Sequence, residues 1–228
     1  MERERLMQII KCRGVLDRGR HLFHAGDPLR SLYVLRSGSI KSWTVTQNGD
    51  DRVIRFHLPG DVLGLGAIGS DRHDCNATTL DTCSVCEIPF NRFQKLAERI
   101  PSLHVQLLRR ISVELVHEER MTLLRWSRSA PTRLAGFLVQ LAQDFELRGY
   151  SNREFYLTMG RRDIANYLGL ALETVSRTLS HFQDEGLLRV EGKYIRVTDR
   201  QRLTEISGPQ YAKIATENVA LHASVGGG

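Results

Sequence analysis

The sequence has little of what a membrane or secreted protein needs. No apolar run approaches the roughly 18 residues of a membrane span, and the first residues, MERERLMQIIKCRG, lack the apolar core of a signal peptide. The 228 residues include only 4 cysteines, which in a cytoplasmic chain do not indicate a structural disulfide framework. We therefore predict a cytoplasmic protein with no membrane partner.

Signals for several enzyme classes are also missing. The sequence contains no phosphate-binding glycine loop, no nucleophile elbow and no set of kinase motifs. His21, His24 and His57 leave a metal-dependent, cupin-like barrel enzyme as an alternative, but no His-x-His pair with a following Glu supports it. The sequence favours a protein that is not an enzyme.

The composition is that of an ordinary globular protein, with 41% hydrophobic and 25% charged residues. The length favours two compact units of roughly 100 residues each. The 32 basic and 26 acidic residues give a net charge of +6, which is compatible with a nucleic-acid partner. Residues 128–207 hold 12 basic and 10 acidic residues, a surplus of only 2, so charge alone does not identify a DNA-binding region.

Short strands are predicted in the first hundred residues. Gly-Asp pairs in HAGDP, QNGDD and LPGDV separate runs rich in Val, Ile, Leu and aromatic residues. VIRFHL alternates in the manner of a strand, and Asn48-Gly49 is a strong hairpin signal. Residues 1–100 are therefore predicted to form a small antiparallel barrel or roll.

A long helix is predicted next, because Pro101 suits a first helical turn and no Gly or Pro occurs from Leu103 to Trp126. One row of its residues follows the alternating spacing of three and four that is typical of a coiled-coil seam. The row predicts a homodimer through residues 101–127, although packing on the helix's own domain is an alternative. The seam residues are Leu108, Ile111, Leu115, Glu118 and Thr122.

Glu118 makes this seam polar. In a parallel symmetric dimer it would face its own copy, and two like charges oppose association. We therefore expect Glu118 to keep the monomer and dimer near balance. After the helix, Ser127 to Pro131 is interpreted as a linker, because the residue before a proline disfavours helix.

The segment RRDIANYLGLALETVSRTLSHF is typical of a helix-turn-helix motif. Ala165 is small enough for two helices to approach closely, Gly169 permits the turn, and Val175 fixes the second helix on the first. An accidental helical hairpin in the core is the alternative. Two strand-like runs separated by Gly192-Lys193 follow, so residues 128–208 are predicted to form a winged helix-turn-helix domain, and residues 209–228 a flexible tail.

The second helix of this motif is predicted to have two different faces. Glu173, Ser176 and Arg177 share one face, which would enter the major groove of DNA. Arg177 can donate to guanine, Glu173 can accept from cytosine, and Ser176 can contact several base edges. Glu173 also has a simpler explanation, because a carboxylate is favourable at a helix N-terminus. The opposite face is expected to pack, through Leu172, Val175, Leu179 and Phe182.

This order of regions and several segments resemble the FNR/ANR branch of the cyclic-AMP receptor protein/FNR superfamily of bacterial transcription regulators. The resemblance covers about residues 5–208 and implies an α+β fold in which residues 1–100 are an antiparallel β-roll that acts as the sensor domain. E-T-V-S-R is its most specific part. The matching segments are FHAGDPLRSLYVLRSGSIKSWTVT, FHLPGDVLGLGAIG, SVCEIPF, REFYLTMGRRDIANYLGLALETVSR and GKYI.

The resemblance implies a dimeric activator that reads a two-fold TTGAT...ATCAA site with Glu173, Ser176 and Arg177, and that controls genes for low-oxygen or redox adaptation. It also implies a contact between RNA polymerase and the hairpin at Asn48-Gly49-Asp50, although a solvated turn explains those residues equally well. The direction of regulation and the signal stay open. A scaffold whose helix-turn-helix binds no specific DNA is a further alternative.

The cofactor is left open by the sequence. Cyclic-AMP-binding members use an Arg-Ser pair late in the roll, where this chain has Cys75-Asn76-Ala77, so cyclic AMP is not expected despite the nearby Arg72. The FNR branch uses a [4Fe-4S] cluster held by four thiolates, and Cys86 in SVCEIPF matches one ligand.

The other three family ligands lie in a segment that would precede Met1. Three explanations therefore stay open: a missing upstream cysteine segment, a cluster-free regulator with another signal, or an unusual site formed by Cys12, Cys75, Cys83 and Cys86. The last is disfavoured because Cys83 and Cys86, three apart on a predicted strand, would point to opposite faces.

Overall fold

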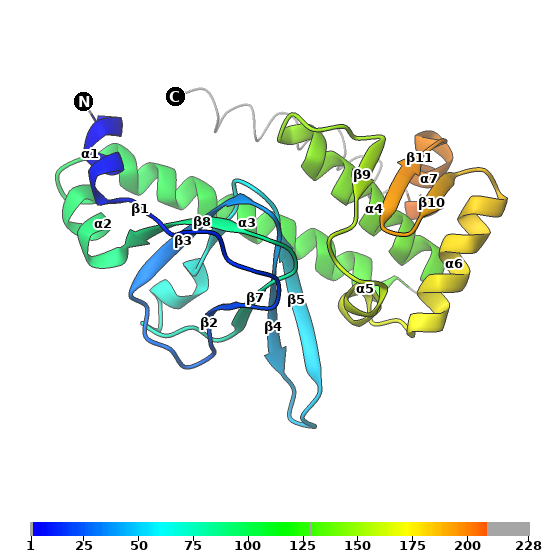
Figure 1. The fold of residues 1–228 in the computed structure, drawn as a ribbon, viewed down its shortest axis with the longest axis horizontal. Helices are drawn as coiled ribbons and strands as arrows, with labels where there is room; N and C mark the ends of the chain where they lie inside the picture. Colours follow the sequence, from blue (N-terminus) through cyan, green and yellow to red (C-terminus); the bar gives the residue numbers. More distant parts are fainter. Residues whose placement is uncertain (1, 128, 209–228) are drawn as a thin grey trace. The chain divides into compact units, whose positions relative to one another are not determined.

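The computed structural model describes residues 2–127 and 129–208, which form two compact units divided after Ser112 (Figure 1). The tail predicted at residues 209–228 lies outside the described residues. None of the helices in the described part is both long enough and apolar enough to cross a membrane.

The first unit contains two four-stranded antiparallel sheets, as predicted for a β-roll. The orders are β1-β8-β3-β6 and β2-β7-β4-β5. The turn predicted at Asn48-Gly49 joins β4 to β5, and these strands form the projecting hairpin in Figure 1. The strands are β1 (Lys11–Cys12), β2 (His21–Phe23), β3 (Ser31–Ser37), β4 (Ile40–Val45), β5 (Asp51–His57), β6 (Val62–Leu63), β7 (Asn76–Thr79) and β8 (Ser84–Pro89).

Two apolar clusters hold this unit together. The first lies within the roll and combines residues of both sheets, such as Leu35 of β3 and Ile40 of β4, which are fully buried. The second gathers around Phe90 and Phe93 of α2 (Phe90–Ala97). Side chains of α1 (Glu2–Ile9) and of the first turns of α3 pack against this second cluster. The short helix η1 (Leu65–Ile68) completes the unit.

The long helix α3 spans Pro101–Trp126, as the sequence predicted. Both ends of α3 could be predicted from the sequence. Pro101 is favourable in the first helical turn, and the residues that follow it include no helix breaker.

The second unit combines helices with a small antiparallel sheet of order β10-β11-β9. The strands on either side of Gly192-Lys193 form a hairpin, as predicted for a wing. The elements are α4 (Ala130–Leu147), β9 (Glu154–Tyr156), α5 (Arg161–Leu168), α6 (Leu172–Asp184), β10 (Leu188–Glu191), β11 (Tyr194–Val197) and α7 (Arg200–Ser207).

The predicted linker at Ser127 to Pro131 is only partly correct, because α4 already begins at Ala130. Ser129 caps the helix, and its hydroxyl oxygen accepts a hydrogen bond from the backbone N–H of Thr132 at 3.4 Å. Pro131 lies in the first turn, where a helix needs no N–H from it. The proline that was taken to exclude helix therefore helps to start one.

An alanine at Gly38 or Gly49 would strain the backbone, but only at Gly38 would its methyl group also collide with neighbouring atoms. Both have positive φ, 82° and 84°. A Cβ at Gly38 would collide with the Thr82 carbonyl oxygen and lie 2.7 Å from Cys83 Sγ, whereas a Cβ at Gly49 would meet nothing within 4 Å.

We expect Gly49→Ala to lower the free energy of unfolding by about 1 to 2 kcal/mol, from backbone strain alone. Gly38→Ala should lower it by about 2 to 5 kcal/mol, because overpacking adds to the same strain. Urea unfolding of both variants tests this, and equal losses would contradict the predicted collision.

Candidate nucleic-acid interface

The turn between α5 and α6 is built on Gly169, as the sequence predicted. Its backbone is left-handed, with φ 63° and ψ 41°, a conformation that favours glycine. The backbone N–H of Leu170 donates to the Ala165 carbonyl at 2.9 Å, which closes the end of α5. Arg133 of α4 donates from Nη1 to the carbonyls of Leu168 and Gly169 at 3.1 and 3.2 Å. The turn is therefore fastened to the helix that precedes the motif.

The packing side of the motif is almost completely buried. Ala165 is 3% exposed and Val175 is 0% exposed, while Leu179 and Phe182 are also buried. Leu172 differs, because it is 37% exposed and does not belong to the packing face that the sequence predicted for it. It is the first residue of α6, so it lies at the turn, before the helix reaches the core.

The other side of α6 carries the three predicted base-reading residues. Glu173 and Arg177 are exposed and Ser176 is half-buried, all within the first six residues of the helix. Ala171 precedes the helix and has no side chain that could cap it. The free N–H groups of a first helical turn carry partial positive charge, which attracts an anion such as a phosphate.

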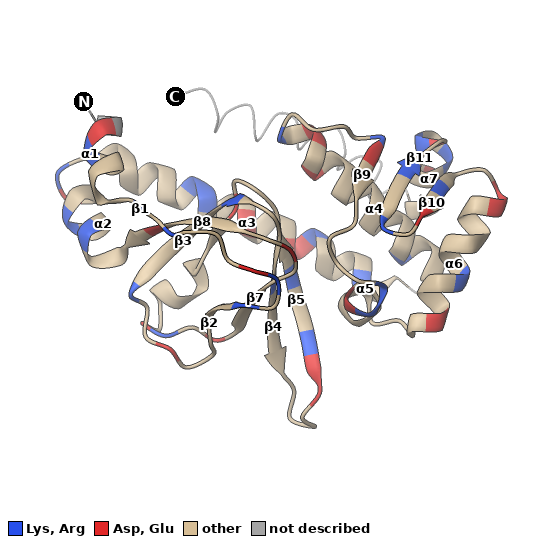
Figure 2. Cartoon of the chain, in the orientation of Figure 1, with Lys and Arg blue, Asp and Glu red and all other residues tan. Residues whose placement is uncertain are grey.

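Basic residues near α6 are available for a DNA backbone, but acidic residues stand among them. Arg161 and Arg162 are exposed at the start of α5, and Lys193 is exposed at the tip of the wing. Figure 2 shows Lys and Arg interspersed with Asp and Glu along α5 and α6. Part of the positive charge is neutralised, since Arg196 pairs with Glu154 at 2.8 Å. Charge alone therefore does not mark this surface as a DNA-binding one.

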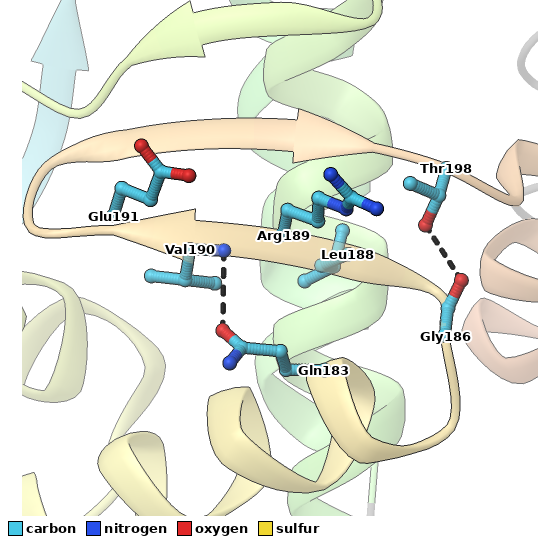
Figure 3. A pocket seen from close by; sticks show the side chains of 7 residues that line it. All are labelled: Gln183, Gly186, Leu188, Arg189, Val190, Glu191 and Thr198. Atoms are coloured by element: carbon cyan, nitrogen blue, oxygen red, sulfur yellow. Dashed lines mark hydrogen bonds between the residues drawn. The ribbon is translucent and has the colours of Figure 1, made fainter.

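The wing is joined to the end of α6 by hydrogen bonds that border a shallow hollow (Figure 3). The Gln183 side-chain oxygen accepts a bond from the Val190 N–H at 3.2 Å. The Thr198 hydroxyl donates to the Gly186 carbonyl at 2.6 Å. The first bond joins β10 to α6, and the second joins the end of the wing to the loop that follows α6. The hollow is lined by Gln183, Gly186, Leu188, Arg189, Val190, Glu191 and Thr198.

The apolar residues of the predicted dimer seam are exposed along α3. Leu108 is 65% exposed, Leu115 is 60% exposed and Ile111 is 36% exposed. Thr122 is half-buried, and its hydroxyl oxygen accepts a bond from Arg125 Nη2 at 3.0 Å. Large apolar side chains that are exposed in a row at seam spacing are available to a partner helix.

Glu118 has charged neighbours within its own chain. Its carboxylate lies 4.0 Å from Arg125 Nη2 and 3.9 Å from His117 Nδ1. His117 Nε2 in turn lies 3.8 Å from Asp144 Oδ2 on α4. Glu118, for which the sequence predicted only its own copy as a neighbour, is therefore part of a network between α3 and α4.

Cys12 and Cys86 form a pair that sequence reasoning missed. Cys12 of β1 lies directly opposite Cys86 of β8, with the two sulfurs 3.2 Å apart. Burial raises the pKa of the Cys86 thiol, and the neighbouring Cys12 thiol raises it further, while Arg36 opposes both effects. The sequence gives no local signal for this pair, because 74 residues separate its members.

The comparisons with known proteins agree with this geometry. Residues 132–206 match the family described as the Crp-like helix-turn-helix domain, and residues 14–100 match the cyclic nucleotide-binding domain family. The chain is 45% identical to the fumarate and nitrate reduction regulatory protein of Escherichia coli K12, covering 91% of this chain and 83% of that protein. It is 44% identical, with the same coverage, to electron transport regulator A of Shewanella oneidensis.

The chain belongs to the FNR/ANR branch of the cyclic-AMP receptor protein/FNR superfamily. Its structure is similar to that of FixK2 from Bradyrhizobium japonicum, with a TM-score of 0.80 and 28% identity over 88% of this chain and 98% of that one. These findings confirm the α+β fold and make this FNR-branch protein a DNA-binding transcription regulator. The matched curated relatives are regulators rather than enzymes.

The four cysteines of this FNR-branch regulator do not gather as a four-thiolate cluster requires. Cys83 is buried and its thiol donates to the Ser39 carbonyl at 3.2 Å, so it points away from the Cys12–Cys86 pair, as strand geometry predicted. Cys75 makes a hydrogen bond with Ser42 instead. Within the described ranges, no group of three or more Cys, His, Asp or Glu residues is placed to hold a metal ion. The described residues therefore do not fit a [4Fe-4S] cluster.

Residues late in the roll are engaged in structural contacts. The Asn76 side-chain oxygen accepts a bond from the Ala25 N–H at 3.1 Å. Arg72 was the cation considered for binding a cyclic phosphate. Its guanidinium donates a hydrogen bond to the Gly26 carbonyl at 2.7 Å. His57, considered for a metal site, is buried and bonded to the Ser42 hydroxyl at 2.7 Å.

The Asp144 carboxylate couples the α3–α4 network to pH. Burial alone would raise the pKa of Asp144, but the hydrogen bond and charge of His117, together with Arg148, outweigh it and lower the pKa. A lowered pKa in the folded state means that this stabilisation is present above the unfolded value of about 3.9 and is lost as pH falls through the folded value.

We expect Asp144→Asn to reduce the free energy of unfolding at neutral pH by about 1.5 to 3 kcal/mol, because a half-buried, charge-assisted contact is lost. Its stability should also fall less steeply than that of the parent protein as pH drops below about 4. Denaturant unfolding across this pH range tests both points. The exposed Asp184→Asn serves as the control, and the idea fails if both variants show the same pH profile.

Proposed function

We propose that this FNR-branch regulator acts as a homodimer that reads a two-fold TTGAT...ATCAA-like site with Glu173, Ser176 and Arg177 of each protomer. The observation that carries this proposal is the division of α6 into two faces. Val175 and Phe182 are buried at 0% and 1%, while Glu173 and Arg177 on the other face are exposed. A helix that is held rigidly from behind can present its polar side chains to base edges in a fixed geometry.

The three side chains differ in what they can read. The Arg177 guanidinium can donate two parallel hydrogen bonds to guanine O6 and N7. The Glu173 carboxylate can accept a bond from the cytosine amino group, and the Ser176 hydroxyl can donate or accept. A TTGAT half-site offers a G·C pair at which Arg177 and Glu173 could bind opposite strands. Arg161, Arg162 and Lys193 would contact phosphates, which position the domain without selecting a sequence.

The dimer supplies the two-fold symmetry of the site. Two recognition helices that read one face of a duplex must lie one turn apart, about 34 to 36 Å. The exposed row of Leu108, Ile111 and Leu115 supports α3 as the interface. Burying such a row from both protomers removes apolar surface from water, which is the main driving force for association.

We further propose that the regulator acts in the cytoplasm on genes for low-oxygen or redox adaptation. The supporting observation is that relatives at 44% and 45% identity are named for fumarate and nitrate reduction and for electron transport. The exposed hairpin turn at Asn48-Gly49-Asp50 is our candidate contact for RNA polymerase, through which activation would occur.

A second candidate is a cluster-free regulator of the same branch with another signal. One observation favours it: Cys83 and Cys75 are engaged with Ser39 and Ser42, apart from the Cys12–Cys86 pair. Both candidates share the same DNA-reading face.

Arg177→Ala tests base reading. We expect the variant to lose about 1 to 3 kcal/mol of binding free energy on a TTGAT...ATCAA duplex, because the bidentate contact to guanine disappears. The loss should vanish on a duplex in which that G·C pair is replaced. Fluorescence anisotropy titrations at fixed salt measure both affinities. Gln94→Ala, exposed on α2 and outside the helix-turn-helix domain, is the control and should bind as the parent does. Equal losses on both duplexes would support non-specific binding instead.

Leu115→Ala and Glu118→Ala test the seam from opposite directions. Leu115→Ala should weaken the dimer by about 2 to 4 kcal/mol, because both protomers lose a buried side chain. Glu118→Ala should strengthen it by about 1 kcal/mol, because two like charges no longer approach one another. Sedimentation equilibrium measures the dimer dissociation constant. Leu123, which is exposed on α3 outside the seam, provides the matched control Leu123→Ala. If all three variants dimerise alike, α3 is not the interface.

A further inference from the structure

The Cys12–Cys86 pair has the geometry of a disulfide that is ready to form. The two residues are direct neighbours across the antiparallel strands β1 and β8. The N–H of Arg13 donates to the Val85 carbonyl at 3.0 Å, so the next pair along, Cys12 and Cys86, is a non-hydrogen-bonded pair. Such pairs have Cα atoms about 4.5 Å apart, within the range of about 4.4 to 6.8 Å that disulfides span.

The register of these strands is held by side chains beside the pair. Arg13 Nε donates to Glu87 Oε2 at 2.8 Å, and the Ser31 hydroxyl donates to Glu87 Oε1 at 2.7 Å. Slipping β1 by one residue would break the first bond and turn Cys12 to the other face of the sheet. The two sulfurs therefore stay 3.2 Å apart because the surrounding ion pair fixes the strand.

We propose that Cys12 and Cys86 form a redox-active dithiol site, which low-molecular-weight disulfides oxidise to a reversible intramolecular disulfide. Cys12 is exposed and accepts a hydrogen bond from Arg36 Nη1 at 3.8 Å, whereas Cys86 is half-buried behind it. The exposed sulfur meets the oxidant and the half-buried one resolves the intermediate.

The chemistry balances in two exchanges. The Cys12 thiolate attacks one sulfur of the small disulfide RSSR, so that a Cys12–SR bond forms and RS⁻ leaves and takes up a proton. The Cys86 thiolate then attacks the Cys12 sulfur, the internal disulfide forms, and a second RS⁻ leaves. The two cysteines lose two electrons and two protons, and RSSR is reduced to two RSH.

The other two cysteines are not equivalent to this pair. Cys83 is 1% exposed in the roll core, and its thiol donates to the Ser39 carbonyl. Cys75 is half-buried and bonded to Ser42. Neither offers an exposed sulfur with a second sulfur in contact, so oxidation should be selective.

The disulfide would fasten the start of the chain to the roll. The two-residue strand β1 follows α1, whose Leu6 and Ile9 pack on the same apolar cluster as Leu103 and Leu107 of α3. A covalent bond at Cys12 therefore restrains the segment that covers the beginning of the long helix. This inference does not rest on the proposed function, because neither the thiol chemistry nor this restraint requires DNA.

The experiment uses the full chain, reduced and then incubated without oxygen in oxidised glutathione. Acid quenching, alkylation of the remaining thiols with N-ethylmaleimide and intact-mass measurement count the thiols that survive. We expect the loss of two alkylatable thiols with no glutathione retained, a linked Cys12–Cys86 peptide after non-reducing digestion, and full recovery with dithiothreitol. Amide exchange at Arg13 should be slower in the oxidised form.

Three variants sharpen the result. Cys12→Ser should lose the rapid reaction, Cys86→Ser should retain one glutathione on Cys12, and Cys75→Ser should behave as the parent. Peptide mapping of the parent chain decides the matter even if a variant folds poorly. The proposal is overturned if Cys12 and Cys86 both remain alkylatable, if glutathione persists on the parent chain, or if the linked peptide joins Cys75 to Cys83.

Discussion

Burial of one face of α6 is the constraint on which the interface depends. Val175, Leu179 and Phe182 lie almost fully out of water, and Gly169 with Arg133 fixes the turn before them. The helix has 3.6 residues per turn, so burying these residues fixes the rotation of α6 about its own axis. The residues on the opposite face must then point to solvent. The direction of the polar side chains is a consequence of core packing, and the DNA recognition proposed for this face would use a surface that the core has already oriented.

The long helix α3 makes apolar contacts in its first turns and charged contacts farther along. Its first turns pack on the cluster around Phe90 and Phe93, while Leu108 and Leu115 remain exposed for a partner. Farther along, Glu118 is joined through His117 to Asp144 of α4. If α3 forms the proposed dimer seam, this carboxylate would link association to the packing of its own domain.

Cys86 lies in a segment that resembles other members of the family, but its neighbours in the fold are different. Cys86 lies in the segment SVCEIPF that resembles the family's cluster-ligand segment, yet its neighbour in the structure is Cys12 rather than a third and fourth thiolate. Two thiols can supply only two of the four thiolates that such a cluster requires, whereas the same two thiols suffice for a disulfide once an oxidant removes two electrons. The dithiol proposed above would respond to oxidants without a cluster in the described part of this chain.

The sequence by itself determined whatever depends on neighbours a few residues apart. The bounds of α3, the hairpin at Asn48-Gly49, the turn at Gly169 and the two faces of α6 follow from proline, glycine and helical spacing, all of which act locally. Leu172 and the start of α4 were misjudged where tertiary packing and capping overrode a local pattern. Only the tertiary structure decided that Cys12 meets Cys86 and that His117 of α3 meets Asp144 of α4. Strand register and helix packing bring together residues that are distant in sequence. No periodic pattern along the chain indicates which residues will meet.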